Sequence, residues 1–324
     1  MSRAREGDAV AYEISYGKRR VPVYRVYARP LRGVPPVPES TFTGRDNVLL
    51  ACEVDMEVFG DDFLPAYTMG DNARVVATDS MKNIVLREAL DFEGATLEGF
   101  LAQVGGRMLE RYDQVQDLEL QGRELPFVSA TVPQGDGRFD ASPVLFRGQG
   151  DGDRSVARLR MRRDAGGRAE GAGVVDHECG RTGLRLLKVT GSAFMRFVRD
   201  EHTTLPERSD RPLYIFLDVF WRYRDVADAL GASHARYVPG EQVRDIVATV
   251  FHEVVSESIQ HLVHEMGLRL LARFTQLAEV RFVAQNRTRD PFHESASDPR
   301  IKVYSDPFPA YGEITLRMRR KEGV

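Results

Sequence analysis

Hydrophobic and polar residues alternate along two stretches near the start of the chain, Val21 to Arg29 and Asn47 to Val58. From Leu50 to Val58 every second residue is apolar, and acidic residues take positions 53, 55 and 57. A period of two residues is typical of a β-strand with one buried and one solvated face. Four prolines between Pro30 and Pro38 interrupt the pattern, so we predict two antiparallel strands joined by a loop.

The period becomes helical after the segment Val75 to Ser80, which we interpret as a strand that brings Thr78 and Asp79 to the start of a helix. Asp79 or Ser80 is expected to cap this helix, because a side-chain oxygen there can accept a free backbone N–H. A second helix is predicted from apolar residues three and four positions apart, namely Leu97, Phe100, Leu101, Val104 and Met108. Strand patterns return near Val115 to Leu120, Val144 to Arg147 and Val156 to Met161.

The second half of the chain repeats this order after a glycine-rich, charged segment, 164–173, that we interpret as a boundary. A long helical segment from Gln242 to Phe274 is interrupted near Ser256 and Ser258, either of which can cap a second helix. Strands are predicted at Thr182 to Thr190, Leu213 to Tyr223, Val280 to Ala284 and Gly312 to Met318. The order strand, strand, helix, helix, strand, strand thus occurs twice, which predicts an α+β fold of two domains.

The 324 residues include 45 basic and 48 acidic side chains, which gives a formal net charge of −3. No excess of positive charge is available to hold a polyphosphate backbone, so nucleic acid is not expected as a partner. No run of about 18 apolar residues occurs, so neither a spanning helix nor a membrane partner is expected. The first residues lack the apolar core of a secretory signal, and two cysteines are too few for a disulfide framework. The cytoplasm is therefore the expected location.

Lys18 is one of only five lysines among the 45 basic residues. A buried lysine can lose its proton and an arginine effectively cannot, so a lysine kept in an arginine-rich chain can serve as a base. A solvated lysine at a strand entrance is the simpler interpretation when the residue is taken alone. Thr78 and Asp79 lie where a helix N-terminus favours an anion, although ordinary capping also accounts for them.

The stretch from Phe194 to Arg211 mixes aromatic rings, arginines and proline. Such a segment offers a ring to stack on and a guanidinium to pair with a planar anion, with surface ion pairing as the ordinary alternative. Gln260 and Asn286 lie at the ends of predicted elements, where a carboxamide can read the donors and acceptors of a heterocycle. Carboxamides at such ends more often cap a helix or face water.

Signals for a metal or a nucleotide cofactor are weak. His261, His264 and Glu265 lie about one turn apart on a helix, but the order is not that of the zinc proteases and no third ligand is evident. No glycine-rich phosphate loop follows a predicted strand. We therefore predict no metal and no nucleotide cofactor.

Taken together and in order, these stretches resemble the cofactor-independent urate oxidases, or uricases. The similarity covers nearly the whole chain. It rests on Tyr16-Gly17-Lys18, Val76 to Ser80 with Lys82-Asn83, Phe194 to Arg211, Ser258-Ile259-Gln260 and Asn286. Its most specific part is Phe197-x-Arg199-Asp200-x-x-Thr203-Thr204-Leu205, and the ending Val303 to Gly312 resembles the bacterial branch.

The resemblance implies two tandem tunnelling-fold domains, each an antiparallel four-stranded sheet with two helices, at 10–165 and 172–320. It also implies a homotetramer around a tunnel, with active sites shared between subunits. The implied reaction converts urate, O2 and water to 5-hydroxyisourate and hydrogen peroxide without a cofactor. In that family the degradation of urate leads toward allantoin.

By resemblance, the second domain would hold the substrate. Phe194 would stack on the purine. Arg211 and Gln260 would grip its pyrimidine edge, with the backbone of Ile259 assisting. Asn286, together with Thr78, would hold O2 or the attacking water above the ring.

The first domain of a neighbouring subunit would then supply the proton relay. A neutral Lys18 would take a proton through the Thr78 hydroxyl and so produce the urate dianion. Because this electron-rich species can give an electron directly to O2, no cofactor is required. Asp79 would contact the substrate through its backbone N–H.

One position departs from the family pattern. Many members place a histidine two residues after the asparagine as the third catalytic member of the relay, and here Thr288 takes that position. A hydroxyl can pass a proton along a water chain but cannot act as a base at neutral pH. Either the relay runs through Lys18, Thr78 and water, or another side chain substitutes, and His293 is the nearest in sequence.

Two other functions remain open. Another tunnelling-fold enzyme acting on a purine or a pterin, such as a cyclohydrolase or an aldolase, would share the architecture and the grip on a planar heterocycle. A cyclohydrolase would normally need Cys and His zinc ligands, which are not evident in this sequence. A purine-binding relic of the family is suggested by Thr288, but a relic has no need of the complete set of site residues. Oxygen uptake in the presence of urate distinguishes the relic from the enzyme.

Overall fold

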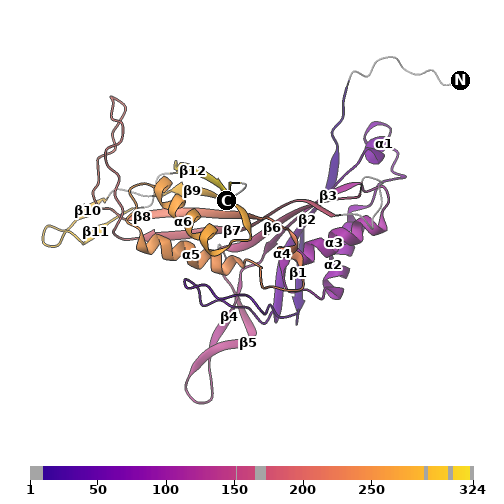
Figure 1. Cartoon of the computed structure of the whole chain (residues 1–324), viewed down its shortest axis with the longest axis horizontal. Coiled ribbons are helices and arrows are strands. Elements are labelled where there is room, and N and C mark those ends of the chain that lie inside the picture. The colour runs from indigo at the N-terminus through magenta and orange to yellow at the C-terminus, as the bar shows by residue number, and fades with distance from the viewer. Residues whose placement is uncertain (1–9, 151, 165–172, 288–290, 306–308, 322–324) are drawn as a thin grey trace.

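The computed structural model describes residues 10–150, 152–164, 173–287, 291–305 and 309–321. Within them, eight strands form an antiparallel sheet in the order β1-β2-β3-β6-β7-β8-β9-β12 (Figure 1). The strands are β1 (Ser15–Val26), β2 (Leu49–Phe59), β3 (Asp117–Glu124), β6 (Arg154–Arg162), β7 (Gly173–Lys188), β8 (Leu213–Tyr223), β9 (Leu277–Asn286) and β12 (Gly312–Arg319). The helices are α1 (Leu64–Thr68), preceded by a 3-10 turn (Asp61–Phe63), α2 (Thr78–Asp91), α3 (Leu97–Arg111), α4 (Ala227–Leu230), α5 (Gly240–Glu253) and α6 (Ile259–Arg273).

The sheet consists of two similar halves. In the first, α2 and α3 lie in the chain between β2 and β3, and in the second, α5 and α6 lie between β8 and β9. The halves join where β6 pairs with β7, with Ala157 opposite Cys179. The predicted α+β fold of two tunnelling-fold units is therefore confirmed, and the two four-stranded sheets continue into each other.

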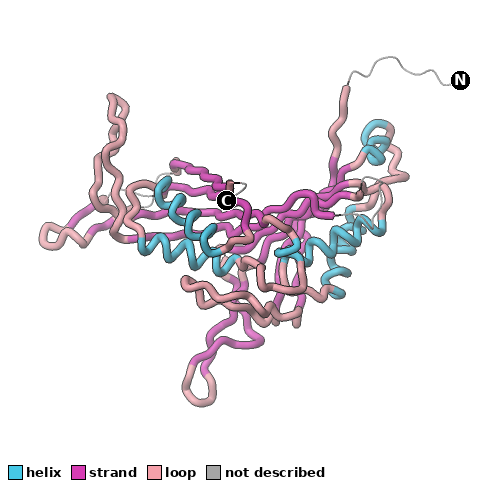
Figure 2. Tube along the Cα trace, viewed as in Figure 1, coloured by secondary structure: helices cyan, strands magenta, loops and turns pink. Residues whose placement is uncertain are grey.

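Each half has its own core on the side of the sheet that carries the helices (Figure 2). The alternation predicted for β2 is present: Val54, Met56 and Val58 are fully buried and pack in the first core. In β8 every second residue is buried as well, and Val219 packs with Ile246 of α5 in the second core. The period-two strands and the amphipathic helices thus bury their apolar sides against each other.

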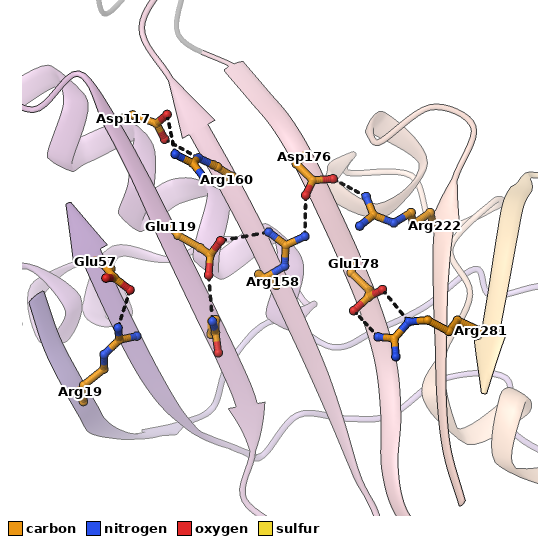
Figure 3. Close-up of polar contacts among 11 residues, drawn as sticks. Arg19, Glu57, Asp117, Glu119, Arg158, Arg160, Asp176, Glu178, Arg222 and Arg281 are labelled. Atoms are coloured by element: carbon orange, nitrogen blue, oxygen red, sulfur yellow. Dashed lines mark hydrogen bonds and ion pairs between the residues drawn. The ribbon is translucent and has the colours of Figure 1, made fainter. Parts of the chain in front are cut away.

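The opposite face of the sheet carries cross-strand ion pairs. Figure 3 shows Glu119 and Asp176 on either side of Arg158, with Arg222 on the far side of Asp176. Further pairs of this face are Arg19 with Glu57, Arg160 with Asp117 and Arg281 with Glu178. Polar residues alternate with the buried apolar ones along these strands, so this face of the sheet is charged.

Two hairpins lie outside the large sheet. The first pairs β4 (Phe127–Pro133) with β5 (Phe139–Gly148). It follows β3 and precedes β6 in the chain, and it projects from the body of the molecule (Figure 1). The second pairs β10 (His293–Glu294) with β11 (Lys302–Val303). The strand predicted near Val144 lies in β5, so it belongs to the first hairpin and not to either four-stranded half.

Several local predictions need correction. The segment at 75–77 is not a strand, and α2 begins at Thr78 after Ala77 without a side-chain cap. Asp79 does not cap the helix, because its carboxylate accepts hydrogen bonds from Lys82 at 2.6 Å and from Asn83 at 2.9 Å. β7 starts at Gly173, well before the predicted strand.

Another prediction concerns the long helical segment of the second half. The break in the long helical segment is confirmed, with Ser258 as the cap of α6. No helix of the described residues is long and apolar enough to cross a bilayer. Most of the glycine-rich boundary segment, 165–172, lies outside the described residues.

Candidate active site

Lys18 lies in β1 at a point where two backbones come unusually close. A Cβ on the preceding residue, Gly17, would lie 1.9 Å from the carbonyl oxygen of Met56, so only glycine fits there. Lys18 is paired with Met56, which is fully buried. The Lys18 side chain therefore starts from the helix-covered face of the sheet and is half-buried. A bulge follows at once, and Arg20 in it has a φ of 56°. It interrupts the pairing of β1 with β2 directly after Lys18, and the pairing resumes at Val21 opposite Val54.

Thr78 is held close to β1 by a tyrosine. The hydroxyl of Tyr16 accepts a hydrogen bond from the backbone N–H of Val76 at 2.8 Å. The Tyr16 ring packs edge-on against Phe63, with centroids 5.0 Å apart. Because Tyr16 and Lys18 are two residues apart in β1, they share one face of the strand, and the start of α2 lies against that face.

The residue before α2 is Ala77, whose methyl side chain cannot accept a hydrogen bond. The first backbone N–H groups of α2 therefore have no side-chain cap. Lys82 holds the pKa of the Asp79 carboxylate below its usual value, through a hydrogen bond and its charge, and the charge of Lys18 acts in the same direction. Lys18 is thus within electrostatic range of Asp79. The structure brings Lys18, Thr78 and Asp79 into one group.

A second group forms around Phe194. The backbone N–H of Phe194 donates to the carbonyl of Arg208 at 2.8 Å, and the reverse bond measures 3.0 Å. The ring of Phe194 stacks on Phe197 at 4.8 Å and 13°, and the Arg211 guanidinium lies 5.5 Å from the Phe194 centroid. The Phe194 ring thus has an aromatic ring and a guanidinium as neighbours, the two kinds of group that can hold a planar anion.

The start of α6 is tied to the same segment through Ser192 and Ser256. Ser192 forms a parallel bridge with Ser256, and the N–H of Arg211 donates to the Ser192 carbonyl at 2.8 Å. Two residues further on, the Ser258 hydroxyl accepts the N–H of His261 at 3.1 Å and starts α6. Ile259 is then buried, and the next residue, Gln260, is exposed.

Asn286 lies at the same end of the sheet. It is the last residue of β9 and is paired with Ile215 of β8 and Gly312 of β12. The following residue donates its N–H to the Tyr214 carbonyl at 2.9 Å. Arg211 comes two residues before β8 begins, so the end of β9 and the entrance to β8 meet here. Phe194, Arg211, Ile259, Gln260 and Asn286 therefore form the second group.

The two groups lie far apart in one chain. Four strands separate β1 from β8 in the sheet, and neighbouring strands are about 4.8 Å apart, so five steps span about 24 Å. Figure 1 shows β1 and α2 on the right and the hairpin of β10 and β11 on the far left. Two cavities, of about 440 Å³ and 840 Å³, are lined by residues of neither group. Lys18 and Thr78 thus cannot reach Phe194 and Arg211 of the same chain.

Comparison with known proteins agrees with this arrangement of two halves. A family model described as uricase matches residues 14–154 and 177–315. The uricase of Haloferax volcanii is 51% identical over 276 residues, which cover 85% of this chain and 88% of the relative. The chain belongs to the uricase family.

Longer relatives and solved structures agree. The uric acid degradation bifunctional protein PucL of Bacillus subtilis is 42% identical over 309 residues, which cover 95% of this chain and 61% of that protein. The crystal structure of urate oxidase from Bacillus sp. TB-90 superposes with a TM-score of 0.91 at 40% identity, covering 95% of this chain and all of that one.

The position of the family histidine and its nearest possible substitute, His293, also remain predictions, as do the roles of the other site residues. Thr288 lies outside the described residues. His293 is exposed in β10, where it pairs with Val303. Its ring packs edge-on against Phe292, with centroids 4.7 Å apart. The role of either residue in the relay therefore stays a prediction.

Sequence reasoning missed the residues that hold the candidate groups in place. Tyr16 was noticed only as the neighbour of Gly17, and Ser192 and Ser256 pair across 64 positions of sequence. The one local signal for this support was the position of Tyr16, two residues before Lys18 and therefore on the same face of the strand. No group of three or more histidine, cysteine, aspartate or glutamate side chains is placed to hold a metal ion in the part of the chain that the structure describes.

Proposed function

We propose that the protein is a urate oxidase that converts urate, O2 and water to 5-hydroxyisourate and hydrogen peroxide. The observation that carries the proposal is the second group, in which backbone hydrogen bonds gather a ring, a guanidinium and two carboxamides at one end of the sheet. Membership of the uricase family supports urate as the substrate. We also propose domain limits of 10–165 and 172–320.

In the proposed mechanism, urate stacks on the ring of Phe194. Arg211 and Gln260 bind the pyrimidine edge as a fork, and the backbone N–H of Ile259 adds a donor at the start of α6. A planar anion suits this set, because a guanidinium offers two parallel donors and a helix N-terminus favours negative charge. Asn286 holds O2 or water above the ring.

The relay comes from a second subunit of a homotetramer. Neutral Lys18 accepts a proton from bound urate through the Thr78 hydroxyl, which leaves the urate dianion. The backbone N–H of Asp79, at the uncapped start of α2, donates to the substrate. The dianion passes electrons to O2, which leaves as peroxide after taking up two protons, and water supplies the new hydroxyl at C5. The roughly 24 Å between the two groups within one chain supports a site shared between subunits.

One assay tests the reaction. Purified protein stripped of metal is mixed with urate, and urate absorbance, dissolved O2 and peroxide are followed together. Equal loss of urate and O2 with equal gain of peroxide is the expected result. Binding of urate without O2 uptake would make the protein a recognition relic.

Mixed oligomers test the shared site. Lys18→Ala and Arg211→Ala are each expected to lose urate oxidation, because each removes one half of every site. Co-expression of the two variants is expected to restore part of the activity, since some mixed sites then contain an intact Arg211 and an intact Lys18. Lys321→Ala, an exposed lysine outside both groups, serves as the control and keeps activity. Activity that stays absent in the mixture would place the whole site in one chain.

A further inference from the structure

A basic pocket lies at the ends of the strands opposite the candidate active site. Its volume is about 840 Å³. It opens where β7 starts, β8 ends, β9 starts and β12 ends, whereas the second group lies at the other ends of β8, β9 and β12. The cationic side chains that define the basic pocket are Arg222, Arg224, Arg317, Arg319, Arg320 and Lys321.

Two carboxylates line the pocket and both already have partners. Glu279, only 4% exposed, pairs with Arg319, and its other oxygen lies 3.5 Å from Arg317 and 3.8 Å from Arg222. Asp176 pairs with Arg222 and, at 2.5 Å, with Arg158 outside the pocket (Figure 3). Six cations against two carboxylates leave an excess of four positive charges, in a chain whose net charge is −3.

Part of this excess is not neutralised by any described carboxylate. Among the described residues, the Arg320 guanidinium donates only to backbone carbonyls, of Leu277 at 2.8 Å, of Phe274 at 3.2 Å and of Leu271. Burial, and then the charge of Arg224, lower the pKa of Arg320. The fold thus holds the positive charges of Arg320 and Arg224 near each other, and no described carboxylate pairs with either. An anion placed between these two side chains would relieve their repulsion.

We propose that the basic pocket binds a compact polyanion of the phosphate class, such as pyrophosphate. Guanidinium forks match phosphate oxygens in pairs, and arginine predominates among the six cations. His177 adds a neutral donor: its Nε2 accepts the N–H of Tyr223 at 2.9 Å, so the neutral ring carries its proton on Nδ1. The volume leaves room for more than one phosphate group. The proposal does not depend on urate oxidation.

Binding is expected to stabilise the folded state, because the pocket joins four strands that separate on unfolding. The melting temperature is measured against inorganic pyrophosphate, with sodium chloride keeping ionic strength constant. A saturable rise of several degrees is expected, and isothermal titration calorimetry is expected to show one site per chain. A rise no larger than that given by chloride at the same ionic strength would overturn the proposal, since screening alone would then explain it.

Two single variants locate the site. Arg224→Gln is expected to weaken pyrophosphate binding about tenfold, the usual cost of one charge-assisted contact. Its fold is expected to survive, because Arg224 is exposed and makes no ion pair with a described residue. Arg147→Gln removes one exposed arginine from the hairpin of β4 and β5, with the same change in net charge, and is expected to bind as the native protein does. Equal weakening in both variants would show that only net charge matters and would refute the pocket.

Discussion

The Tyr16 hydroxyl accepts a hydrogen bond from the Val76 backbone N–H at 2.8 Å, and this bond joins the two elements of the proposed relay. Lys18 lies two residues after Tyr16 in β1, and Thr78 lies two residues after Val76. Burial raises the pKa of Tyr16, so its hydroxyl stays protonated at neutral pH. One neutral hydrogen bond therefore fixes the spacing between the proposed base and the hydroxyl that serves it.

Tyr16→Phe is expected to lower kcat for urate several-fold with little change in KM, because the relay loosens while the substrate clamp is intact. The free energy of unfolding is expected to fall by about 1 kcal/mol, since the Val76 N–H loses its partner. Steady-state urate oxidation and urea unfolding measure the two effects. The control is Tyr67→Phe, which removes an exposed hydroxyl bonded to the Ser15 carbonyl at 2.8 Å and should leave kcat unchanged. Native kcat in Tyr16→Phe would mean that Thr78 needs no such support.

Gly17→Ala is expected to destabilise the protein by about 3 kcal/mol, because the new Cβ would meet the Met56 backbone oxygen at 1.9 Å and force β1 away from β2. Denaturant unfolding measures the loss, and urate oxidation should fall with it because Lys18 is the next residue. Gly106→Ala, in the middle of α3 with open space around its Cβ, is the matched control. It should stabilise by about 0.5–1 kcal/mol. Equal stability of the two variants would contradict the close approach at Gly17.

The sequence correctly predicted the features that depend on residues close together in the chain. The alternation from Leu50 to Val58 located β2, because one face of that strand is buried along its whole length. The serines at 256 and 258 indicated the start of α6 to within two residues, because a cap acts within three residues, and Ser258 is the cap in the structure. The start of α2 was predicted incorrectly, since Tyr16, some 60 residues earlier, holds the preceding segment. The pairing of β4 with β5 outside the sheet likewise depends on partners that no single strand pattern specifies.

The candidate site shows the same limit. Each side chain could be named from its stretch of sequence through the family resemblance. The separation of these residues into two groups, one at β1 and one at β8, could not be predicted from their spacing in the sequence. It follows from the order of the strands in the folded sheet. The bridge between Ser192 and Ser256, which brings the start of α6 to Phe194, likewise joins segments far apart in the sequence and could not be predicted from either one.

Glu98 of α3 is expected to make stability depend on pH. It is 3% exposed and accepts a hydrogen bond from the Tyr237 hydroxyl at 3.1 Å. Burial, and then the charge of Glu124, raise the pKa of Glu98 from 4.5 to about 7. Between these values the folded state keeps a proton that the unfolded state has released, so the free energy of unfolding falls as the pH rises through this window, by about 3 kcal/mol at most.

Glu98→Gln keeps a neutral acceptor for Tyr237 and removes the titration. Its unfolding free energy, measured from pH 4.5 to 8, should therefore be flatter than that of the native protein and higher at pH 8. Glu93→Gln, an exposed glutamate five residues before Glu98, should leave the profile as it is. A native slope in Glu98→Gln would assign the pH dependence to another group.

Ser258→Ala tests how the start of α6 serves the substrate clamp. The Ser258 hydroxyl accepts the N–H of His261 at 3.1 Å, so its loss should cost about 1 kcal/mol of unfolding free energy. Fraying of the first turn should also displace the Ile259 N–H and Gln260. The KM for urate is therefore expected to rise several-fold, with kcat nearly unchanged because, in the proposed shared site, Lys18 and Thr78 come from a different subunit.

The matching cap in the first half separates the two effects. Thr96 caps α3 by accepting the N–H of Gly99 at 3.1 Å, and Thr96→Ala should cost a similar amount of stability. Because α3 carries none of the proposed substrate contacts, KM should stay near its native value in that variant. If KM rose equally in both, loss of stability alone would explain the effect, and the first turn of α6 would have no special part in holding urate.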